Sequence, residues 1–142
     1  MSGQPAARRT VLKGAALAGT AGLGLAACST ESKVGHAENP VPTAPVDLGA
    51  ADAVPAGGVK LYREERLVVS RDDKGKCKAF SAQCTHAGCV LTKIDKDGGH
   101  CPCHGSRFDV RTGEVLEGPA TVPLPKVDVR EEGGKLIAGP KA

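Results

Sequence analysis

Short apolar runs separated by turn-forming residues fill the larger, C-terminal part of the chain. From Val46 onward, Val, Leu, Ile and Phe recur in short stretches with Gly, Pro and Asp between them. This pattern predicts strands at 59–62, 67–71, 77–81, 90–94, 107–110, 127–131 and 135–138. Turns are expected at 72–75, 95–99, 111–113 and 133–134. No stretch has a helical period longer than about two turns, so we expect an all-β domain of small stacked sheets.

The segment 1–27 has a different character. A polar stretch ends in Arg8-Arg9, an Ala- and Gly-rich run follows, and the sequence Leu-Ala-Ala leads to Cys28. This order is typical of a signal peptide. The paired arginines resemble a twin-arginine signal, and Leu-Ala-Ala-Cys resembles a bacterial lipobox, which would leave Cys28 as the lipid-bearing residue. The alternative is an uncleaved membrane anchor, but residues 14–27 would form only about 21 Å of helix against a hydrocarbon core of ~30 Å.

Residues 28–45 have no apolar period and contain several prolines, which predicts a flexible tether. His36 lies in this segment without a neighbouring ligand residue, and we interpret it as solvated. Leader and tether together predict export in the folded state by the twin-arginine route. The protein would then be held at the outer face of a bacterial cytoplasmic membrane by its lipid or by a short N-terminal segment.

Charge and composition narrow the function further. The net charge of +3 comes from Arg8, Arg9 and Lys13, because the leader has no acidic residue and the remaining basic and acidic side chains are equal in number. Lys and Arg alternate with Asp and Glu rather than clustering, which argues against nucleic acid as a partner. With one Tyr, two Phe and no Trp, the core needs support from a metal or a disulfide.

Two segments carry the candidate chemistry, CTHAGC at 84–89 and CPCHGSRF at 101–108. Each places one cysteine and one histidine close together, Cys84 with His86 and Cys101 with His104. Two thiolates and two imidazoles suit either a tetrahedral zinc ion or an iron–sulfur cluster. Each segment also has a second cysteine that a four-ligand site does not use. In an exported protein such a pair favours a disulfide, which is rare in a zinc module.

Both segments resemble the two cluster-binding boxes of Rieske iron–sulfur proteins in sequence, order and separation, within a similarity that covers roughly residues 46–138. The resemblance implies a domain at 46–142 with Rieske-like stacked antiparallel sheets. It also implies a small cluster-binding subdomain inserted as two loops, and one [2Fe–2S] cluster. Cys84 and Cys101 would ligate one iron, and His86 and His104 the other.

The same resemblance assigns roles to the neighbouring residues. Cys89 and Cys103 would form the disulfide found in the quinol-oxidising branch of the family. Residues 118–120, Gly-Pro-Ala, resemble a third loop that covers the cluster. Ser106 stands where the family places a hydroxyl that hydrogen-bonds a bridging sulfide. Phe108 stands where quinol-oxidising members usually have a tyrosine that bonds a ligand sulfur, which predicts a lower reduction potential here.

The ligand set also implies proton coupling. Neutral imidazoles in place of two thiolates raise the potential above that of an all-cysteine cluster. Reduction adds negative charge and favours protonation of His86 and His104, so electron uptake is expected to bring proton uptake. These two residues would then be the point of electron entry and exit, the proton-binding residues and the site at which a partner docks.

The remaining candidate residues are interpreted as structural. Cys77 lies in a predicted strand and is read as a small buried apolar residue rather than a functional thiol. His100 is read as a loop residue, and Arg107 and Asp109 as surface and turn groups. No catalytic nucleophile–base pair is found in the sequence.

The leading hypothesis is a membrane-tethered extracytoplasmic Rieske protein that performs one-electron, proton-coupled transfer. It would act alone or as the small subunit of an oxidoreductase, for example one like arsenite oxidase. The first alternative is the Rieske subunit of a cytochrome bc complex, which oxidises quinol and reduces a c-type cytochrome. The expected partners are therefore a cytochrome b or c, or an oxidoreductase large subunit, with quinol as a further candidate. A cytoplasmic dioxygenase ferredoxin is disfavoured because such proteins typically lack the disulfide pair. A structural zinc module is the alternative from another class.

Overall fold

The computed structural model describes residues 41–96 and 98–142. Within these ranges the chain forms antiparallel β-sheets, and the only helical element there is a 3₁₀ turn, η1 (Ala51–Ala53). The all-β fold expected from the apolar pattern is confirmed. The predicted leader and residues 28–40 of the predicted tether lie outside the described residues. In the part of the chain that is described, no helix has the length and apolar character required to span a membrane.

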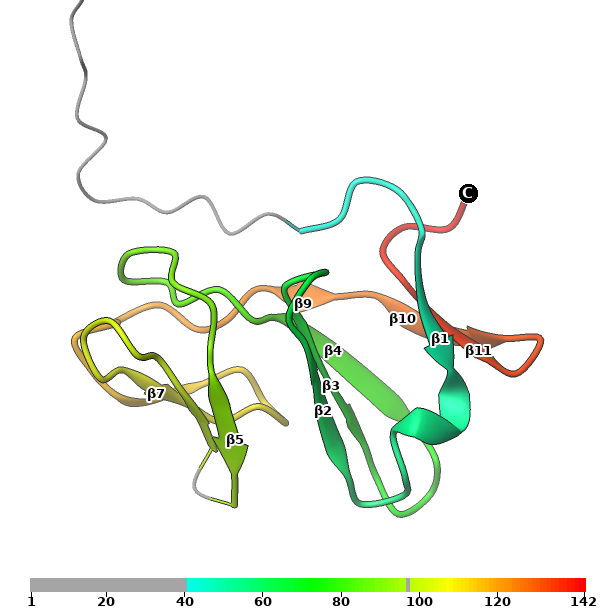
Figure 1. Ribbon diagram of the computed structural model, residues 1–142, viewed down its shortest axis with the longest axis horizontal. Coiled ribbons are helices and arrows are strands. Elements are labelled where there is room, and N and C mark those ends of the chain that lie inside the picture. The colour runs from blue at the N-terminus through cyan, green and yellow to red at the C-terminus, as the bar shows by residue number, and fades with distance from the viewer. Residues whose placement is uncertain (1–40, 97) are drawn as a thin grey trace, which may run out of the picture. The chain divides into compact units, whose positions relative to one another are not determined.

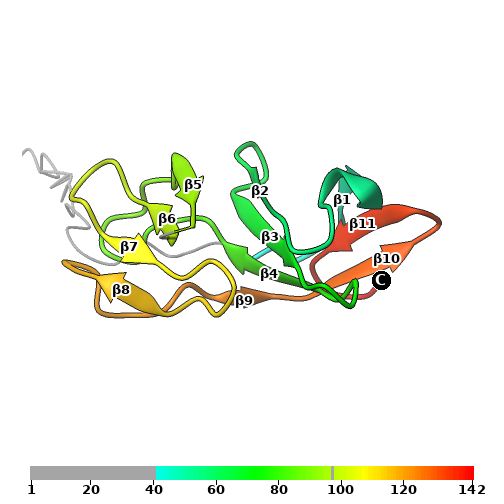
Figure 2. The same ribbon diagram turned by 90° about the horizontal axis from the view of Figure 1, so that it is seen from below.

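The strands form three sheets (Figures 1 and 2). The first has the order β1 (Val46–Ala50), β11 (Lys135–Ala138), β10 (Val129–Glu132). The second has the order β2 (Val59–Tyr62), β3 (Leu67–Arg71), β4 (Cys77–Ser81), β9 (Lys126–Val127). The third has the order β5 (Lys93–Asp95), β6 (Gly98–His100), β7 (Arg107–Phe108), β8 (Val115–Glu117). The third sheet is formed by the chain between β4 and β9, which we call the insertion. The insertion also contains both cysteine segments.

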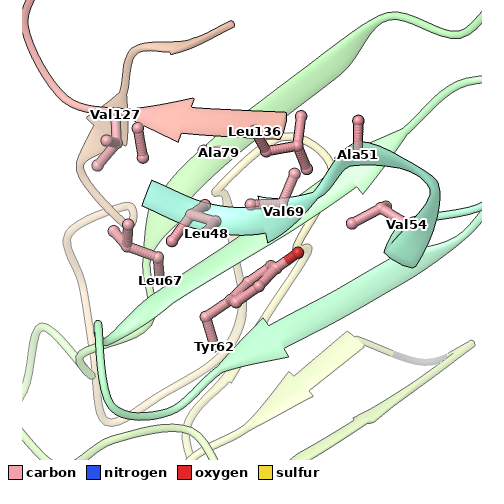
Figure 3. Close-up of a cluster of buried hydrophobic side chains, with 10 residues drawn as sticks. Leu48, Ala51, Val54, Tyr62, Leu67, Val69, Ala79, Val127 and Leu136 are labelled. Carbon is pink, nitrogen blue, oxygen red and sulfur yellow. The ribbon is translucent and has the colours of Figure 1, made fainter. Parts of the chain in front are cut away.

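Strand β3 separates two hydrophobic clusters. Leu67, Val68 and Val69 are all 0% exposed, and because side chains alternate along a strand, they point to opposite faces of the second sheet. Leu67 and Val69 belong to a cluster with side chains of the first sheet, and Figure 3 shows Val69 beside Leu136 of β11. Val68 belongs to the other cluster, which joins the second sheet to the insertion. Burial on both faces explains the three consecutive apolar residues that begin β3.

Two arginines also connect the insertion to the second sheet. Arg63, which follows β2, donates a hydrogen bond from Nη2 to the carbonyl oxygen of Thr92. Arg111, in the turn after β7, donates from Nη2 to the carbonyl oxygen of Gly57 at 2.7 Å. The insertion is therefore attached near both ends of β2.

Four predicted strands have the observed bounds, and the others differ. The strand expected at 90–94 is displaced to β5, and the one expected at 107–110 is limited to β7. The strand expected at 127–131 is interrupted at Asp128, because the chain leaves the second sheet after β9, which pairs with β4, and enters the first with β10, which pairs with β11. Strands β1, β6 and β8 were not predicted.

The turn expected at 95–99 is wrong at its first residue, because Asp95 ends β5, and at its last two, because Gly98 and Gly99 lie in β6. A Cβ on Gly98 would lie 2.4 Å from the carbonyl oxygen of Phe108, and one on Gly99 would lie 2.8 Å from side-chain atoms of Leu91 and Val110. Both glycines are therefore required by the close approach of neighbouring chain segments. From the sequence alone a glycine pair indicates a turn, because the local sequence does not show which distant segments approach it in the fold.

We expect Gly98→Ala to lower the free energy of unfolding by about 1–3 kcal/mol more than Gly75→Ala. Both glycines have positive φ, +116° and +85°, but nothing lies within 4 Å of a Cβ built on Gly75. The difference therefore reports the close approach of the Phe108 carbonyl and the Leu116 side chain to Gly98, together with its larger φ. Chemical denaturation of both variants measures it, and equal losses would contradict the packing explanation.

Candidate metal centre

The first cysteine segment forms a closed loop that begins at the end of the second sheet. The backbone N–H of Cys84 donates to the carbonyl oxygen of Cys89, and that of Gly88 donates to the carbonyl oxygen of Cys84, both at 2.8 Å. Gly88 has a φ of +81°, a conformation that favours glycine. The bridge between Gln83 and Val90 joins the base of this loop.

The second cysteine segment repeats this arrangement. The N–H of Cys101 donates to the carbonyl oxygen of Ser106 at 2.9 Å, and that of Gly105 donates to the carbonyl oxygen of Cys101 at 3.2 Å. Gly105 has a φ of +79°. Each loop thus places its first cysteine at the same point of the same turn, although the histidine follows two residues later in the first loop and three residues later in the second.

A disulfide between Cys89 and Cys103 joins the two loops, with 6.4 Å between the Cα atoms. The pair is the one expected from the resemblance. In the chain-entropy model, closing a loop of about 15 residues stabilises the fold by roughly 3 kcal/mol. A domain with few aromatic residues gains a large part of its stability from such a link.

The two thiols that remain free in the loops lie side by side in the second hydrophobic cluster. Cys84 is 1% exposed and Cys101 3%, and both thiols are free. Burial raises the pKa of the Cys101 thiol, while backbone N–H groups of Cys103 and His104 oppose this by donating to its sulfur. The same N–H groups would stabilise negative charge on that sulfur when it ligates a metal.

The two histidines meet at the surface. The Nδ1 atoms of His86 and His104 lie 3.3 Å apart. Their ring centroids are 4.7 Å apart, the planes cross at 82°, and both residues are exposed. A pair of buried thiols and a pair of exposed imidazoles therefore project from the same two loops.

A third loop, residues 118–123, is bonded to both. The N–H of Ala120 donates to the buried hydroxyl oxygen of Ser106 at 3.0 Å, and the Thr85 hydroxyl donates to the carbonyl oxygen of Val122 at 2.6 Å. Since Ser106 accepts with its oxygen, its proton stays free to be donated. Thr85 is a contact that the sequence analysis did not identify, although its place beside a candidate ligand was a signal.

Phe108 is 0% exposed and packs in the same cluster as Cys84 and Cys101. A phenyl ring has no hydroxyl, so this position donates no hydrogen bond to a ligand sulfur.

The other candidates have structural surroundings. Cys77 is half-buried in β4 and packs against the first cluster. Asp109 is a turn residue, since its Oδ1 accepts the N–H groups of Arg111 and Thr112. Arg107 pairs with Glu117 across β7 and β8 at 3.1 Å. His100 is not a loop residue, because it lies in β6 with Nε2 3.2 Å from Asp95. His36 lies outside the described residues.

The donor set divides into two pairs, which suits a centre of two irons with two ligands on each. Two buried thiols fit the iron with sulfur ligands, and two exposed imidazoles fit the other. Cys84, Cys101, His86 and His104 can therefore hold a [2Fe–2S] cluster.

Fold and site together define a class of protein, an all-β domain whose inserted loops present two cysteines and two histidines for an iron–sulfur cluster. The Rieske [2Fe-2S] domain family matches residues 44–128. The chain therefore belongs to this family, whose members bind one [2Fe–2S] cluster.

The chain is similar to several known relatives. A cytochrome b6-f complex iron-sulfur subunit from Chlorobaculum thiosulfatiphilum is 38% identical over 92 residues, 63% of this chain and 50% of that subunit. The chain thus spans about half the length of this curated relative.

Solved structures resemble it over most of its length. The ferredoxin of carbazole 1,9a-dioxygenase from Nocardioides aromaticivorans IC177 has a TM-score of 0.50 and 29% identity, over 70% of this chain and 100% of that protein. The cyanobacterial plasma membrane Rieske protein PetC3 from Synechocystis PCC 6803 has a TM-score of 0.52 and 29% identity, over 67% of this chain and 99% of that protein.

We expect Phe108→Tyr to raise the reduction potential. A hydroxyl donated to a ligand sulfur stabilises the reduced state more, because that state carries one more negative charge. A hydrogen bond of about 0.5–1.5 kcal/mol corresponds to roughly 20–65 mV for one electron. Voltammetry measures the shift. Ser106→Ala, which removes a hydroxyl donor, is the control for a shift in the opposite direction and should lower the reduction potential. An unchanged midpoint in Phe108→Tyr with a native optical spectrum would defeat this account.

Proposed function

We propose that this protein is a membrane-tethered, extracytoplasmic carrier of single electrons. When bound, the [2Fe–2S] cluster takes up and releases one electron. The observation that carries the proposal is the exposure of His86 and His104 beside the buried pair of thiols. Two imidazoles at the surface let a partner approach the centre through its histidine side, while the buried cysteines keep the other side from water.

Proton coupling follows from the same exposure. Each imidazole that uses Nδ1 as a ligand holds a proton on Nε2. Reduction adds negative charge next to these rings and favours the protonated form. His86 and His104 would then bind or release a proton with the electron.

The disulfide supports a location outside the cytoplasm. Disulfides persist in oxidising compartments and are rare in the cytosol, and the bond between Cys89 and Cys103 joins the two loops of the site. This favours an exported carrier over a cytoplasmic dioxygenase ferredoxin, despite the similarity to the carbazole dioxygenase ferredoxin. The Arg8-Arg9 pair and the sequence ending at Cys28 support export by the twin-arginine route and attachment by lipid.

The second candidate function is that of the Rieske subunit of a cytochrome bc complex, with quinol as electron donor and a c-type cytochrome as acceptor. It is favoured by the similarity to cytochrome b6-f iron-sulfur subunits. Phe108 counts against it, because a lower potential weakens the driving force for quinol oxidation.

Purification of the full-length protein from its native membranes distinguishes the two functions. We expect a red-brown protein with a cluster spectrum and no haem b or c in stoichiometric amount. Stoichiometric haem would identify a bc subunit and overturn our preference for a separate carrier. A colourless protein that contains zinc would overturn both.

The same preparation tests the attachment to the membrane. We expect the mature chain to begin at Cys28 and to carry the added mass of acyl chains, as measured by mass spectrometry of the N-terminal peptide. A chain that retains residues 1–27 would identify an uncleaved anchor. A Cys28→Ser variant is the control and should lose the added mass.

The midpoint potential is expected to fall as the pH rises. It should be constant where the exposed ring nitrogens are protonated in both redox states, and fall by about 59 mV per pH unit where only the reduced state holds the proton. Voltammetry over neutral to alkaline pH measures this slope. A potential that does not change with pH would exclude His86 and His104 as proton sites.

A further inference from the structure

Two neighbouring hollows lie where the chain leaves the second sheet after β9. One has a volume of about 200 Å³ and is lined by residues 76–78 and 126–129. The other has a volume of about 240 Å³ and is lined by Val41, Pro42, Lys126, Asp128, Gly139 and Pro140. Because Lys126 and Asp128 line both hollows, we treat the two as one surface and call it the lysine face. Figure 2 shows β9 between the insertion and the first sheet.

Three exposed lysines line the lysine face. Lys78 lies two residues before Phe80 in β4, and Lys126 of β9 is paired with Phe80. Residues two apart along a strand point to the same side of a sheet, and so do residues paired across two strands. Lys78 and Lys126 therefore share one side of the second sheet. Lys76 comes directly before β4 and lines the same hollow.

The positive charge of these lysines is not neutralised by close partners. In the described ranges none of the three forms an ion pair with a carboxylate. Asp128 is the single acidic residue among those that line the two hollows. In the adjoining turn, Asp72 accepts the backbone N–H of Lys76 with its Oδ1, and Asp73 is offset by Lys74. Three lysines against one aspartate leave the lysine face with a net positive charge.

Val41 adds an apolar side chain to the lysine face. It is 40% exposed and is one of three large apolar residues with such exposure in the part of the chain that the structure describes. Pro42 and Pro140 line the same hollow. Lysine ammonium groups attract acidic headgroups, and apolar side chains beside them can enter the boundary between headgroups and acyl chains. Lysines next to exposed apolar residues therefore suit the surface of an acidic membrane.

From these observations we propose that the lysine face rests on acidic phospholipid headgroups of the membrane to which the protein is attached. The inference rests on the membrane attachment in the proposed function. Each lysine close to an acidic membrane raises the affinity about fivefold, and salt screens this attraction. The residues that line the hollows lie outside the loops 84–89, 101–106 and 118–123. The residues that meet lipid are thus distinct from those that present the histidines to a redox partner.

Cys77 is a built-in reporter of this contact. It lines the hollow between Lys76 and Lys78, and it is the one thiol in the described ranges that stays free when Cys84 and Cys101 ligate the cluster. The full-length holoprotein is purified from its native membranes and reconstituted in vesicles of phosphatidylcholine, with or without phosphatidylglycerol. A water-soluble maleimide without charge alkylates Cys77, and mass spectrometry of the Cys77 peptide gives the rate. A charged reagent is avoided because acidic lipid would change its concentration at the surface.

We expect alkylation of Cys77 to be about fivefold slower, or more, in the vesicles that contain phosphatidylglycerol, because headgroups then cover the hollow. About 1 M KCl should restore the rate, since the screening length falls to roughly 3 Å. Equal rates in the two kinds of vesicle would overturn the inference. Protection of Cys77 in native membranes but in neither kind of vesicle would assign the lysine face to an acidic protein and would equally contradict it.

A pair of charge variants tests which lysines are responsible. Lys78→Glu combined with Lys126→Glu should be alkylated at the same rate in both kinds of vesicle. Each variant is compared with itself in the two lipids, so an altered intrinsic reactivity of Cys77 cancels. Lys60→Glu combined with Lys96→Glu is the matched control, because both lysines are exposed and lie outside the hollows. The control should keep the protection, and its loss there would mean that overall charge, and not the lysine face, binds lipid. The optical spectrum checks that the variants retain the cluster.

The proposed function and this inference fail in different measurements. Alkylation of Cys77 needs no electron transfer, so it reports contact with lipid whatever the preparation contains. Protected Cys77 in a colourless, zinc-containing protein would overturn the proposed electron transfer and support the lysine face as a lipid-binding surface. Recovery of the native protein in the soluble fraction, without association with membranes, would overturn the membrane attachment and the inference together.

Discussion

Two thiols buried side by side at the end of a hydrophobic cluster are the constraint on which the rest of this structure depends. Cys84 and Cys101 lie in different loops, and each is almost fully buried among the side chains that join the insertion to the second sheet. Burial of polar or ionisable groups is costly unless they bond to a partner. Here backbone N–H groups of Cys103 and His104 donate to the sulfur of Cys101 and oppose the rise in its pKa that burial causes.

The shape of the loops follows from this requirement. Each is closed by the same two backbone hydrogen bonds, with a left-handed glycine at the same position. The histidine then projects outward from each loop, so the imidazoles meet at the surface while the thiols meet inside. The disulfide joins the first loop to the second, Ser106 joins the second to the third, and Thr85 joins the first to the third. Every pair of loops is thus connected, which holds four ligands in place on a domain with a small core.

This construction separates two tasks. The side toward the core tunes the centre, through the Ser106 hydroxyl, the backbone N–H groups and the apolar ring of Phe108. The side toward solvent presents the two exposed histidines. A change such as Phe108→Tyr is made on the first side and leaves the exposed histidines in place.

The sequence by itself determined the fold class, four strands with their bounds and the candidate ligands. Strands such as Leu67–Arg71 and the boxes 84–89 and 101–108 are recognisable because each is a local pattern of residue types. Only the tertiary structure decided what depends on neighbours distant in sequence. Gly98 and Gly99 form a strand because the Phe108 carbonyl and the Leu91 and Val110 side chains approach them closely. The strand expected at 127–131 is divided because its first part pairs with β4 in the second sheet and its second part pairs with β11 in the first. Thr85 bonds the third loop across a separation of 37 residues. The physical reason is the same in each case, since close packing and hydrogen bonds between distant segments leave no periodic trace in the local sequence.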